Sequence, residues 1–374
     1  MLAESSQITA IDLFCGAGGL SLGLKNAGIE VVAGIDLDPA CQFPYEENLK
    51  ATFLRKDVGE VEASELEGLW TPGRYRLLAG CAPCQPFSSH RRGADTSKED
   101  NWDLLSHFAR LVEETTPEFV TMENVTRLSR MSVFSDFVAK LEELDYEVEY
   151  GTLYGPQFGL PQERRRLVLV ASRVGAVGLP EGEKDKTKFK TVEQTIKTLP
   201  KLRHGEGDPK DPLHTARKLS VMNLARMQAS IPGGTWRDWP EELLAPCHRK
   251  ASGRSFQAFY GRMRWDSPSP TITTQSFNFG TGRFGHPEQD RSLTLREAAM
   301  LQGFPRSYKF VAKGQRPSMQ AVGRLIGNAV PPAFGLAVGR QFLALASEIS
   351  QEQPRAGAGQ GSQTCALDGT LGTG

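Results

Sequence analysis

Two patterns of apolar and polar residues alternate along the first 172 residues of the chain. Short apolar runs rich in β-branched residues predict buried strands, and stretches with an apolar residue every three or four positions predict amphipathic helices. The expected strands cover residues 8–14, 30–34, 53–56, 76–80, 119–122, 147–153 and 167–172, and the expected helices cover 20–27, 103–114 and 134–144. Strands that alternate with helices are typical of an open α/β sheet.

The periodic pattern is lost after residue 172. Residues 173–292 are rich in glycine, proline, serine, threonine and basic residues, and we expect a smaller, irregular, mostly β domain there. Helices are expected again at 293–301, 318–325 and 333–347. Thr294 is placed as the N-cap of the first of these helices, and Glu297 completes its capping box.

Composition limits the class of protein. At 374 residues the chain is long enough for two domains and a substantial core. Its six cysteines are irregularly spaced, which gives no disulfide framework and favours a reducing compartment. The N-terminus lacks the pattern of a signal peptide, and no apolar run is long enough for a membrane span. We therefore expect a soluble, cytoplasmic protein without membrane contacts.

The net charge of zero conceals an asymmetry between the two halves of the chain. Residues 1–160 contain 26 acidic and 13 basic residues, a net charge of −13. Residues 161–374 contain 18 acidic and 31 basic residues, a net charge of +13, with arginines among aromatic and glycine residues at 255–265 and 281–286. Ordinary solvated surface is the alternative, but the pattern favours a second half that faces a polyanion.

A glycine turn, Cys-Gly-Ala-Gly-Gly at 15–19, connects the first expected strand to the first expected helix. Ser21 stands where a dinucleotide fingerprint has its third glycine, and there is no Gly-Lys-Ser/Thr of a phosphate-binding loop. Asp36 and Asp57 end the next two expected strands, where Asp36 could accept from ribose hydroxyls and Asp57 could reach an adenine amino group. The expected ligand is a nucleoside without a diphosphate, and S-adenosylmethionine is the leading candidate.

The fourth expected strand runs into a loop that carries Cys84 between two prolines. Pro83 and Pro86 stop regular pairing, and catalytic groups of open α/β sheets collect where strands end. Cys84 is therefore a candidate nucleophile. Cys81 and Cys84 also form a Cys-x-x-Cys pair, for which a redox dithiol, half of a zinc site or a purely structural role are the alternatives. A redox pair should open a helix, which Pro86 opposes, and no second pair of zinc ligands stands at the required spacing.

Further polar groups are expected beside the same cleft. Glu123 ends the fifth expected strand and is a candidate acid, with an exposed loop carboxylate as the alternative. Three arginines at 164–166 lead into a buried strand, which is costly unless they meet an anion or a carboxylate. The polar segment 90–101 has the composition of a lid or of a nucleic-acid contact.

Taken together, these stretches resemble the DNA (cytosine-5)-methyltransferases, of the bacterial restriction-modification or Dcm-like type, over about residues 8–347. Asp-Leu-Phe-Cys-Gly-Ala-Gly-Gly at 12–19 is similar to the cofactor loop of that family, and Pro-Cys-Gln at 83–85 is similar to its nucleophile motif. Later motifs are matched in family order by Glu-Asn-Val at 123–125, Gln-Glu-Arg-Arg-Arg at 162–166, Arg-Glu-Ala-Ala-Met-Leu-Gln-Gly-Phe-Pro at 296–305 and Gly-Asn-Ala-Val-Pro at 327–331.

The resemblance implies an α/β fold with a Rossmann-like, S-adenosylmethionine-dependent methyltransferase sheet. This catalytic domain would comprise residues 1–185 and 316–350, a mostly β target recognition domain would comprise 186–315, and 351–374 would form a disordered tail. S-adenosylmethionine is the implied cofactor and double-stranded DNA the implied substrate, with no metal. A cognate restriction endonuclease is a further expected partner of a monomeric enzyme.

The resemblance also implies a role for individual residues. Cys84 would attack C6 of a flipped-out cytosine, and Glu123 would stabilise the charge that builds on the ring. Arg164 and Arg166 would hold the O2 edge, with Pro83 and Gln85 flanking the nucleophile. The implied cofactor-binding residues are Phe14, Ala17, Gly18, Gly19, Leu20, Asp36, Leu37, Asp57, Val58, Pro83, Leu104, Asn328, Ala329 and Val330. The implied DNA-binding residues are Ser88, Arg91, Arg92, Arg254, Arg262, Arg264, Thr273 and Arg283.

Two other classes share parts of this pattern. A tRNA cytosine-5 methyltransferase carries the same motifs, although the recognition region is long for that class. A catalytically inactive DNA-binding relative is the non-enzyme alternative, although every catalytic position is filled. Within the recognition region, the Thr-rich segment 267–274 resembles a family motif, and we expect the base-reading loops around it.

Overall fold

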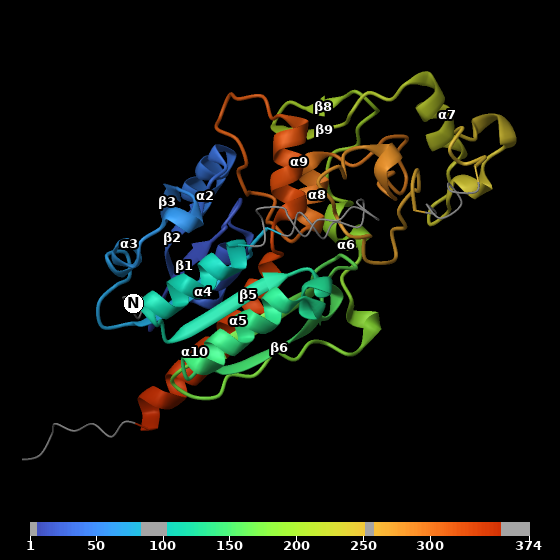
Figure 1. Ribbon diagram of the computed structural model, residues 1–374. Helices are drawn as coiled ribbons and strands as arrows, with labels where there is room; N and C mark the ends of the chain where they lie inside the picture. The colour runs from blue at the N-terminus through green and yellow to red at the C-terminus, as the bar shows by residue number, and fades with distance from the viewer. Residues whose placement is uncertain (1–5, 84–102, 251–257, 353–374) are drawn as a thin grey trace, which may run out of the picture.

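A computed structural model describes residues 6–83, 103–250 and 258–352, and a seven-stranded sheet lies at its centre (Figure 1). The strand order is β3-β2-β1-β4-β5-β7-β6, with five parallel strands and with β7 antiparallel to both β5 and β6. The expected α/β sheet is confirmed, and a hairpin of β6 and β7 closes one edge. The strands of this sheet are β1 (Ile8–Leu13), β2 (Glu30–Asp36), β3 (Thr52–Arg55), β4 (Tyr75–Gly80), β5 (Phe119–Asn124), β6 (Glu147–Tyr154) and β7 (Arg165–Ser172).

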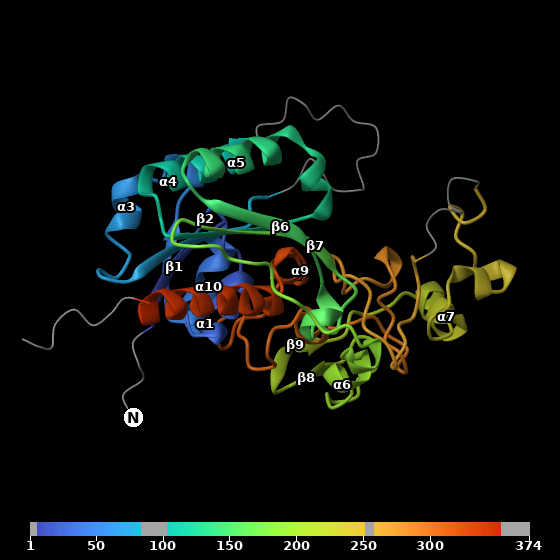
Figure 2. The same cartoon turned by 90° about the horizontal axis from the view of Figure 1, so that it is seen from below.

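Helices cover both faces of the sheet because successive strand residues point to opposite sides. In β1, Ile8 and Ala10 belong to one hydrophobic cluster, whereas Ile11 and Leu13 belong to another. The helices around the sheet are α1 (Gly19–Ala27), α2 (Gln42–Leu49), α3 (Ala63–Glu67), α4 (Asp103–Thr115), α5 (Ser132–Glu143) and α10 (Pro332–Glu352). Figure 2 shows α4 and α5 on one face and α1 and α10 on the other.

The first and last helices of the sheet domain are in backbone contact. A Cβ atom at Gly23 would lie 2.2 Å from the carbonyl oxygen of Pro332, and one at Gly335 would lie 2.5 Å from that of Leu20. Only glycine leaves room for such an approach. Through this contact, α10 returns the end of the described chain to the helix that follows the glycine turn.

One stretch, Met319–Gln351, is long and apolar enough to cross a membrane by length and composition alone. The stretch consists of two helices, α9 (Met319–Asn328) and α10, and 61% of its most apolar window is buried inside the protein. It is apolar because it supplies the core beneath the sheet.

Residues 186–315 form an irregular region beside the carboxyl ends of the central strands (Figure 1). Its irregular character is confirmed, but its described part contains fewer strands than a mostly β domain requires. The remaining backbone pairing involves isolated bridges such as Arg262 with Gly285. The elements of this region are α6 (Val192–Ile196), β8 (Gly207–Asp208), β9 (Asp211–Thr215), α7 (Val221–Ala229) and α8 (Leu295–Leu301).

The region has only a small hydrophobic cluster of its own, built around Trp236 and Trp239. Its α8 and the nearby Phe304 belong instead to the large cluster that includes residues of α1 and α10. The two parts of the chain therefore share a core. The domain boundaries near residues 185 and 315 stay a prediction.

A buried ion pair fixes the start of α8. Arg291 donates from both terminal nitrogens to the carboxylate of Glu297, at 2.8 and 2.7 Å, and both side chains are almost fully buried. Thr294 and Glu297 form the expected capping box, with Glu297 accepting from the Thr294 amide at 2.8 Å. Burial alone would raise the pKa of Glu297, but Arg291 holds that pKa down to about 2.

We expect Glu297→Gln to destabilise the fold by about 3–5 kcal/mol, because the substitution leaves Arg291 as an uncompensated buried charge. The pKa of Glu297 is lower in the folded chain than in the unfolded one, so its contribution is present above about pH 4.5 and is lost as the pH falls towards 2. Urea unfolding between pH 2 and 7 measures both effects. The matched control is Asp266→Asn in the exposed Arg264–Asp266 pair, for which we expect no measurable loss of stability. Equal losses in the two variants would contradict this assignment.

Candidate active site

The polar residues expected at strand ends lie along one edge of the sheet. Parallel pairing brings Leu13 of β1 opposite Gly80 of β4, and Gly80 opposite Met122 of β5. The segments that follow these strands therefore emerge side by side, as does the end of β2 at Asp36. In open α/β sheets this carboxyl edge is where ligands bind.

The glycine turn has a backbone that most residues avoid. Phe14, Gly16 and Gly18 have φ angles of 55°, 54° and 82°. A Cβ atom at Gly16 would meet no described atom within 4 Å, whereas one at Gly19 would lie 2.1 Å from the carbonyl oxygen of Val330. The turn therefore has open space on one side and touches the 328–330 segment on the other.

Ser21, which replaces the third glycine of a dinucleotide fingerprint, has a structural partner. Its hydroxyl donates to Oδ2 of Asp12 at 2.5 Å and lies 2.8 Å from the hydroxyl of Tyr45. Burial raises the pKa of Asp12 to about 7. This network holds the start of α1 against β1, and the sequence pattern had not singled out Asp12 or Tyr45.

Asp36 reaches across to the glycine turn. Its Oδ2 accepts from the Gly16 amide at 2.9 Å and its Oδ1 accepts from the Asp38 amide at 2.9 Å. Burial raises the pKa of Asp36 above its ordinary value. The Cys41 thiol also donates to Asp36, so about one of the roughly four lone-pair sites of the carboxylate remains for a ligand. Beside it, the Leu37 side chain is 61% exposed, which is unusual for leucine and presents an apolar surface.

The other predicted cofactor residues differ in whether their side chains are buried or exposed. Asp57 accepts from the Gly59 amide at 2.9 Å and caps the short 3-10 helix Val58–Glu60. The side chain of Val58 is buried in the core, so only its main chain is available to a ligand. Ala17, Leu20, Ala329 and Val330 are also buried, Leu104 is half-buried, and Asn328 is exposed.

Glu123 is held between two side chains at the end of β5. Its Oε1 lies 3.2 Å from Nε of Arg166, and its Oε2 accepts from the thiol of Cys81 at 3.1 Å. The next residue, Asn124, donates from Nδ2 to the carbonyl oxygen of Ala82 at 3.0 Å. Pro83 is exposed and is the last described residue before Cys84. Cys84 and Gln85 lie outside the described residues.

The three adjacent arginines have three different partners. Arg164 is buried and donates to the carbonyl oxygens of Ile272 and Gly327, at 3.1 and 3.2 Å. Burial, and next the charge of Arg166, lower the pKa of Arg164 to about 9. Arg165 stacks over the ring of Tyr154 at 4.2 Å. Within the part of the chain that the structure describes, only Arg166 has the expected carboxylate partner, so the geometry favours Arg166 over Arg164 as the side chain that faces a substrate.

The predicted DNA-binding residues are placed differently from one another. Arg264 and Thr273 are exposed, and Arg283 is half-buried. Arg262 is buried and donates to the carbonyl oxygen of Met227 and to Asp290, both at 2.7 Å. This is a correction, because Arg262 holds the irregular loops together and does not face solvent. Ser88, Arg91, Arg92 and Arg254 lie outside the described residues.

A buried pair of glutamines joins the segments around the site. Gln162 donates to Oε1 of Gln302 at 2.9 Å and accepts from the Ile272 amide at 2.9 Å. Gln302 in turn donates to the carbonyl oxygen of Ala329 at 2.6 Å. Sequence reasoning had quoted both glutamines within motifs without giving them a role, since nothing in the pattern separates a buried amide from an exposed one.

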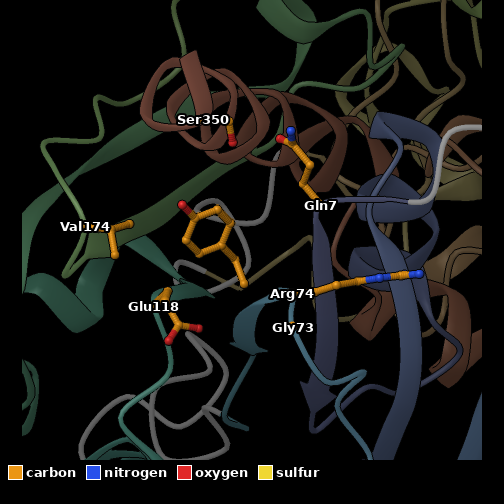
Figure 3. Close-up of a pocket in the computed structure, with 7 residues that line it drawn as sticks. Gln7, Gly73, Arg74, Glu118, Val174 and Ser350 are labelled. Atoms are coloured by element: carbon orange, nitrogen blue, oxygen red, sulfur yellow. The ribbon is translucent and has the colours of Figure 1, made fainter. Parts of the chain in front are cut away.

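A cavity of about 540 Å³ lies at the other end of the central strands, away from their carboxyl ends (Figure 3). It is lined by Glu118, Arg74 and neighbouring residues at the amino ends of the strands. Glu118 is paired with Arg76, and Arg74 with Glu30, so the charges there have partners within the fold. Across 6–83, 103–250 and 258–352, no three His, Cys, Asp or Glu side chains are placed to hold a metal ion.

The sequence of the chain matches the protein-family model for C-5 cytosine-specific DNA methylases over residues 8–344. The chain belongs to this family. It is a DNA (cytosine-5-)-methyltransferase, and its family uses S-adenosylmethionine as methyl donor. The identification disfavours the redox and zinc alternatives for the Cys-x-x-Cys pair.

Two bacterial relatives align with this methyltransferase over most of its length. The type II methylase M.HgiDII of Herpetosiphon aurantiacus is 44% identical, over 92% of this chain and 97% of the relative. The type II methyltransferase M1.HphI of Haemophilus parahaemolyticus is 32% identical, over 90% and 87%. A solved structure of a protein encoded within an Escherichia coli prophage has the same fold, with a TM-score of 0.69, 21% identity, and 91% and 99% coverage.

Proposed function

We propose that this methyltransferase transfers a methyl group to C5 of a flipped-out cytosine within a specific double-stranded DNA sequence, through a covalent bond between Cys84 and C6. The observation that carries the proposal is the Glu123–Arg166 pair at the end of β5, beside the segment that leads to Cys84. The similarity to type II methylases favours DNA over tRNA as substrate and also favours a cognate restriction endonuclease as partner. A monomeric state remains a prediction.

The cofactor surface supports S-adenosylmethionine. The open space at Gly16, the remaining acceptor site of Asp36 and the exposed Leu37 fit a ribose and the face of an aromatic base, and the turn has no phosphate-binding signature. Asp36 would accept from the ribose hydroxyls, and Asp57 and the 328–330 segment would border the rest of the ligand. When bound, S-adenosylmethionine supplies an electrophilic methyl group on its sulfonium.

The chemistry follows from cytosine being a weak carbon nucleophile. The Cys84 thiolate would add to C6, and the electron pair of the C5–C6 double bond would become available at C5 to accept the methyl group. The S–CH3 bond of the donor would break at the same time, so that the sulfonium would leave as a neutral thioether. Glu123 and Arg166 face the N3 and O2 edge and stabilise the charge that develops there. A base then removes the C5 proton, the double bond re-forms, and the thiolate leaves. The cytosine must be out of the stack for both faces of the ring to be reached.

Cys84→Ser should abolish methylation and leave DNA binding largely unchanged, because a hydroxyl has a far higher pKa than a thiol and is a poor nucleophile towards C6. Duplex DNA with 5-fluorocytosine at the target should trap the parent enzyme, since fluorine cannot leave C5 as a cation. Mass spectrometry locates the adduct. The exposed Cys247 supplies the control, because Cys247→Ser should be trapped like the parent. An adduct on a residue other than Cys84 would overturn the covalent mechanism.

Asp36→Ala should weaken S-adenosylmethionine binding by about 1–3 kcal/mol, the scale of losing a charged acceptor. Because burial raises the pKa of Asp36, the affinity of the parent should fall as the pH drops towards that raised pKa. Calorimetry measures both the affinity of Asp36→Ala for S-adenosylmethionine and the pH dependence of the affinity of the parent.

Asp38→Ala is the matched control for Asp36→Ala. Asp38 caps the short 3-10 helix Pro39–Cys41 and pairs with Arg324. Its removal should cost about 0.5–2 kcal/mol of folding stability without changing cofactor affinity. Unchanged affinity in Asp36→Ala, or equal losses of affinity in the two variants, would place the ribose elsewhere.

We further propose that residues 186–315 read the DNA sequence. The exposed Arg264 and Thr273 lie in or beside the Thr-rich segment 267–274, and an arginine paired with guanine gives about 1–3 kcal/mol of discrimination per base. Exchange of residues 186–290 for those of a relative with another target should transfer the target, as mapped by bisulfite sequencing of plasmid DNA. A chimera that still methylates the parental target would assign specificity to the first half of the chain.

A further inference from the structure

The thiol of Cys81 has no part in the covalent chemistry, yet it contacts the carboxylate on which that chemistry depends. Its Sγ lies 3.1 Å from Oε2 of Glu123, while Nε of Arg166 lies 3.2 Å from Oε1. Each carboxylate oxygen thus faces one side chain of the protein. The side chain of Glu123 is only 6% exposed, and the charge of the buried Arg164 also acts on it.

The backbone fixes the position of this thiol. Gly80 pairs with Met122 across the parallel β4–β5 ladder, so the next residues along, Cys81 and Glu123, are neighbours. On the other side, the Cys81 amide donates to the carbonyl oxygen of Leu13 at 3.3 Å. One residue further on, Asn124 holds the carbonyl oxygen of Ala82. Pairing within the sheet therefore fixes where the donor lies.

The chemical nature of this donor matters. A thiol is a weak, neutral hydrogen-bond donor, whereas arginine is a strong, permanently charged one. A carboxylate between two cations would have its lone pairs committed to them. With a cation at Oε1 and a thiol at Oε2, the plane of the carboxylate is set and Oε2 keeps an acceptor site for the edge of a base.

We propose that Cys81 is a positioning residue that orients the Glu123 carboxylate towards the cytosine. The inference rests on the proposed function, in which Glu123 contacts the ring. It assigns the two cysteines of the Cys-x-x-Cys pair to different tasks, since the first orients the acid and the second attacks C6. The side chain of Cys81 acts through Glu123 and does not itself touch the reacting atoms.

Two substitutions separate the hydrogen bond from the packing of Cys81. Cys81→Ser keeps a donor, and Cys81→Val keeps apolar volume without a donor. Cys81→Ala removes the donor without introducing a β-branched side chain. It replaces Cys81→Val in the comparison if valine disturbs the end of β4. The measurements are thermal unfolding, KM for S-adenosylmethionine and for DNA, and the rate of methyl transfer in a single turnover.

We expect Cys81→Val and Cys81→Ala to slow methyl transfer by roughly 3- to 30-fold, below the scale of a strong hydrogen bond to a charged group because a thiol is a weak donor. KM for S-adenosylmethionine should stay within about twofold, and Cys81→Ser should restore the rate to within about threefold of the parent. A full rate in Cys81→Val, or an equal loss in Cys81→Ser and Cys81→Ala, would overturn the proposal. Failure of the proposed function would differ, because the parent itself would then not methylate DNA.

Discussion

The packing of α10 against α1 is the constraint on which the arrangement of the site depends. The contact brings two backbones closer than any Cβ atom allows, so it specifies both the spacing and the register of the two helices. The chain leaves the sheet domain after β7, builds the irregular region, and returns through α9 and α10. Because α10 docks on the helix that follows the glycine turn, the 328–330 segment that precedes it lies against that turn. The proposed cofactor surface is therefore made from two segments that are about 300 residues apart in the sequence.

Much of this could be predicted from local pattern. Strands with alternating or β-branched runs were found within a few residues, and Asp36 and Glu123 were placed correctly because a polar residue directly after a buried strand must lie at the edge of the sheet. The hairpin of β6 and β7 was not predicted, since strand direction depends on pairing between distant segments. The shortage of strands in the irregular region was missed for a related reason: its carbonyl groups accept from turn amides and from side chains such as Arg262, and propensity gives no information about that.

Arginine shows most clearly where sequence reasoning ends. Arg164, Arg262 and Arg291 are all buried, and each guanidinium spans several backbone or carboxylate oxygens. In the sequence they are indistinguishable from Arg264, which is exposed. Part of the excess positive charge of the second half therefore belongs to buried arginines that stabilise the fold, and the rest lies at the surface. Its value of +13 overstates the charge that a polyanion would meet.

The Thr-rich segment 267–274 is tied to the arginine segment by main-chain hydrogen bonds. The Ser269 amide donates to the carbonyl oxygen of Pro161 at 2.9 Å, and the Glu163 amide donates to that of Ser269 at 2.8 Å. The side chain of Gln162 accepts from the Ile272 amide. A Cβ atom at Gly327 would also lie 2.3 Å from the Thr274 amide. This segment therefore ties the irregular region to the strand that carries Arg166. An insertion or deletion within 267–274 would displace Arg166 from Glu123, whereas a change in loops further away would leave that pair in place.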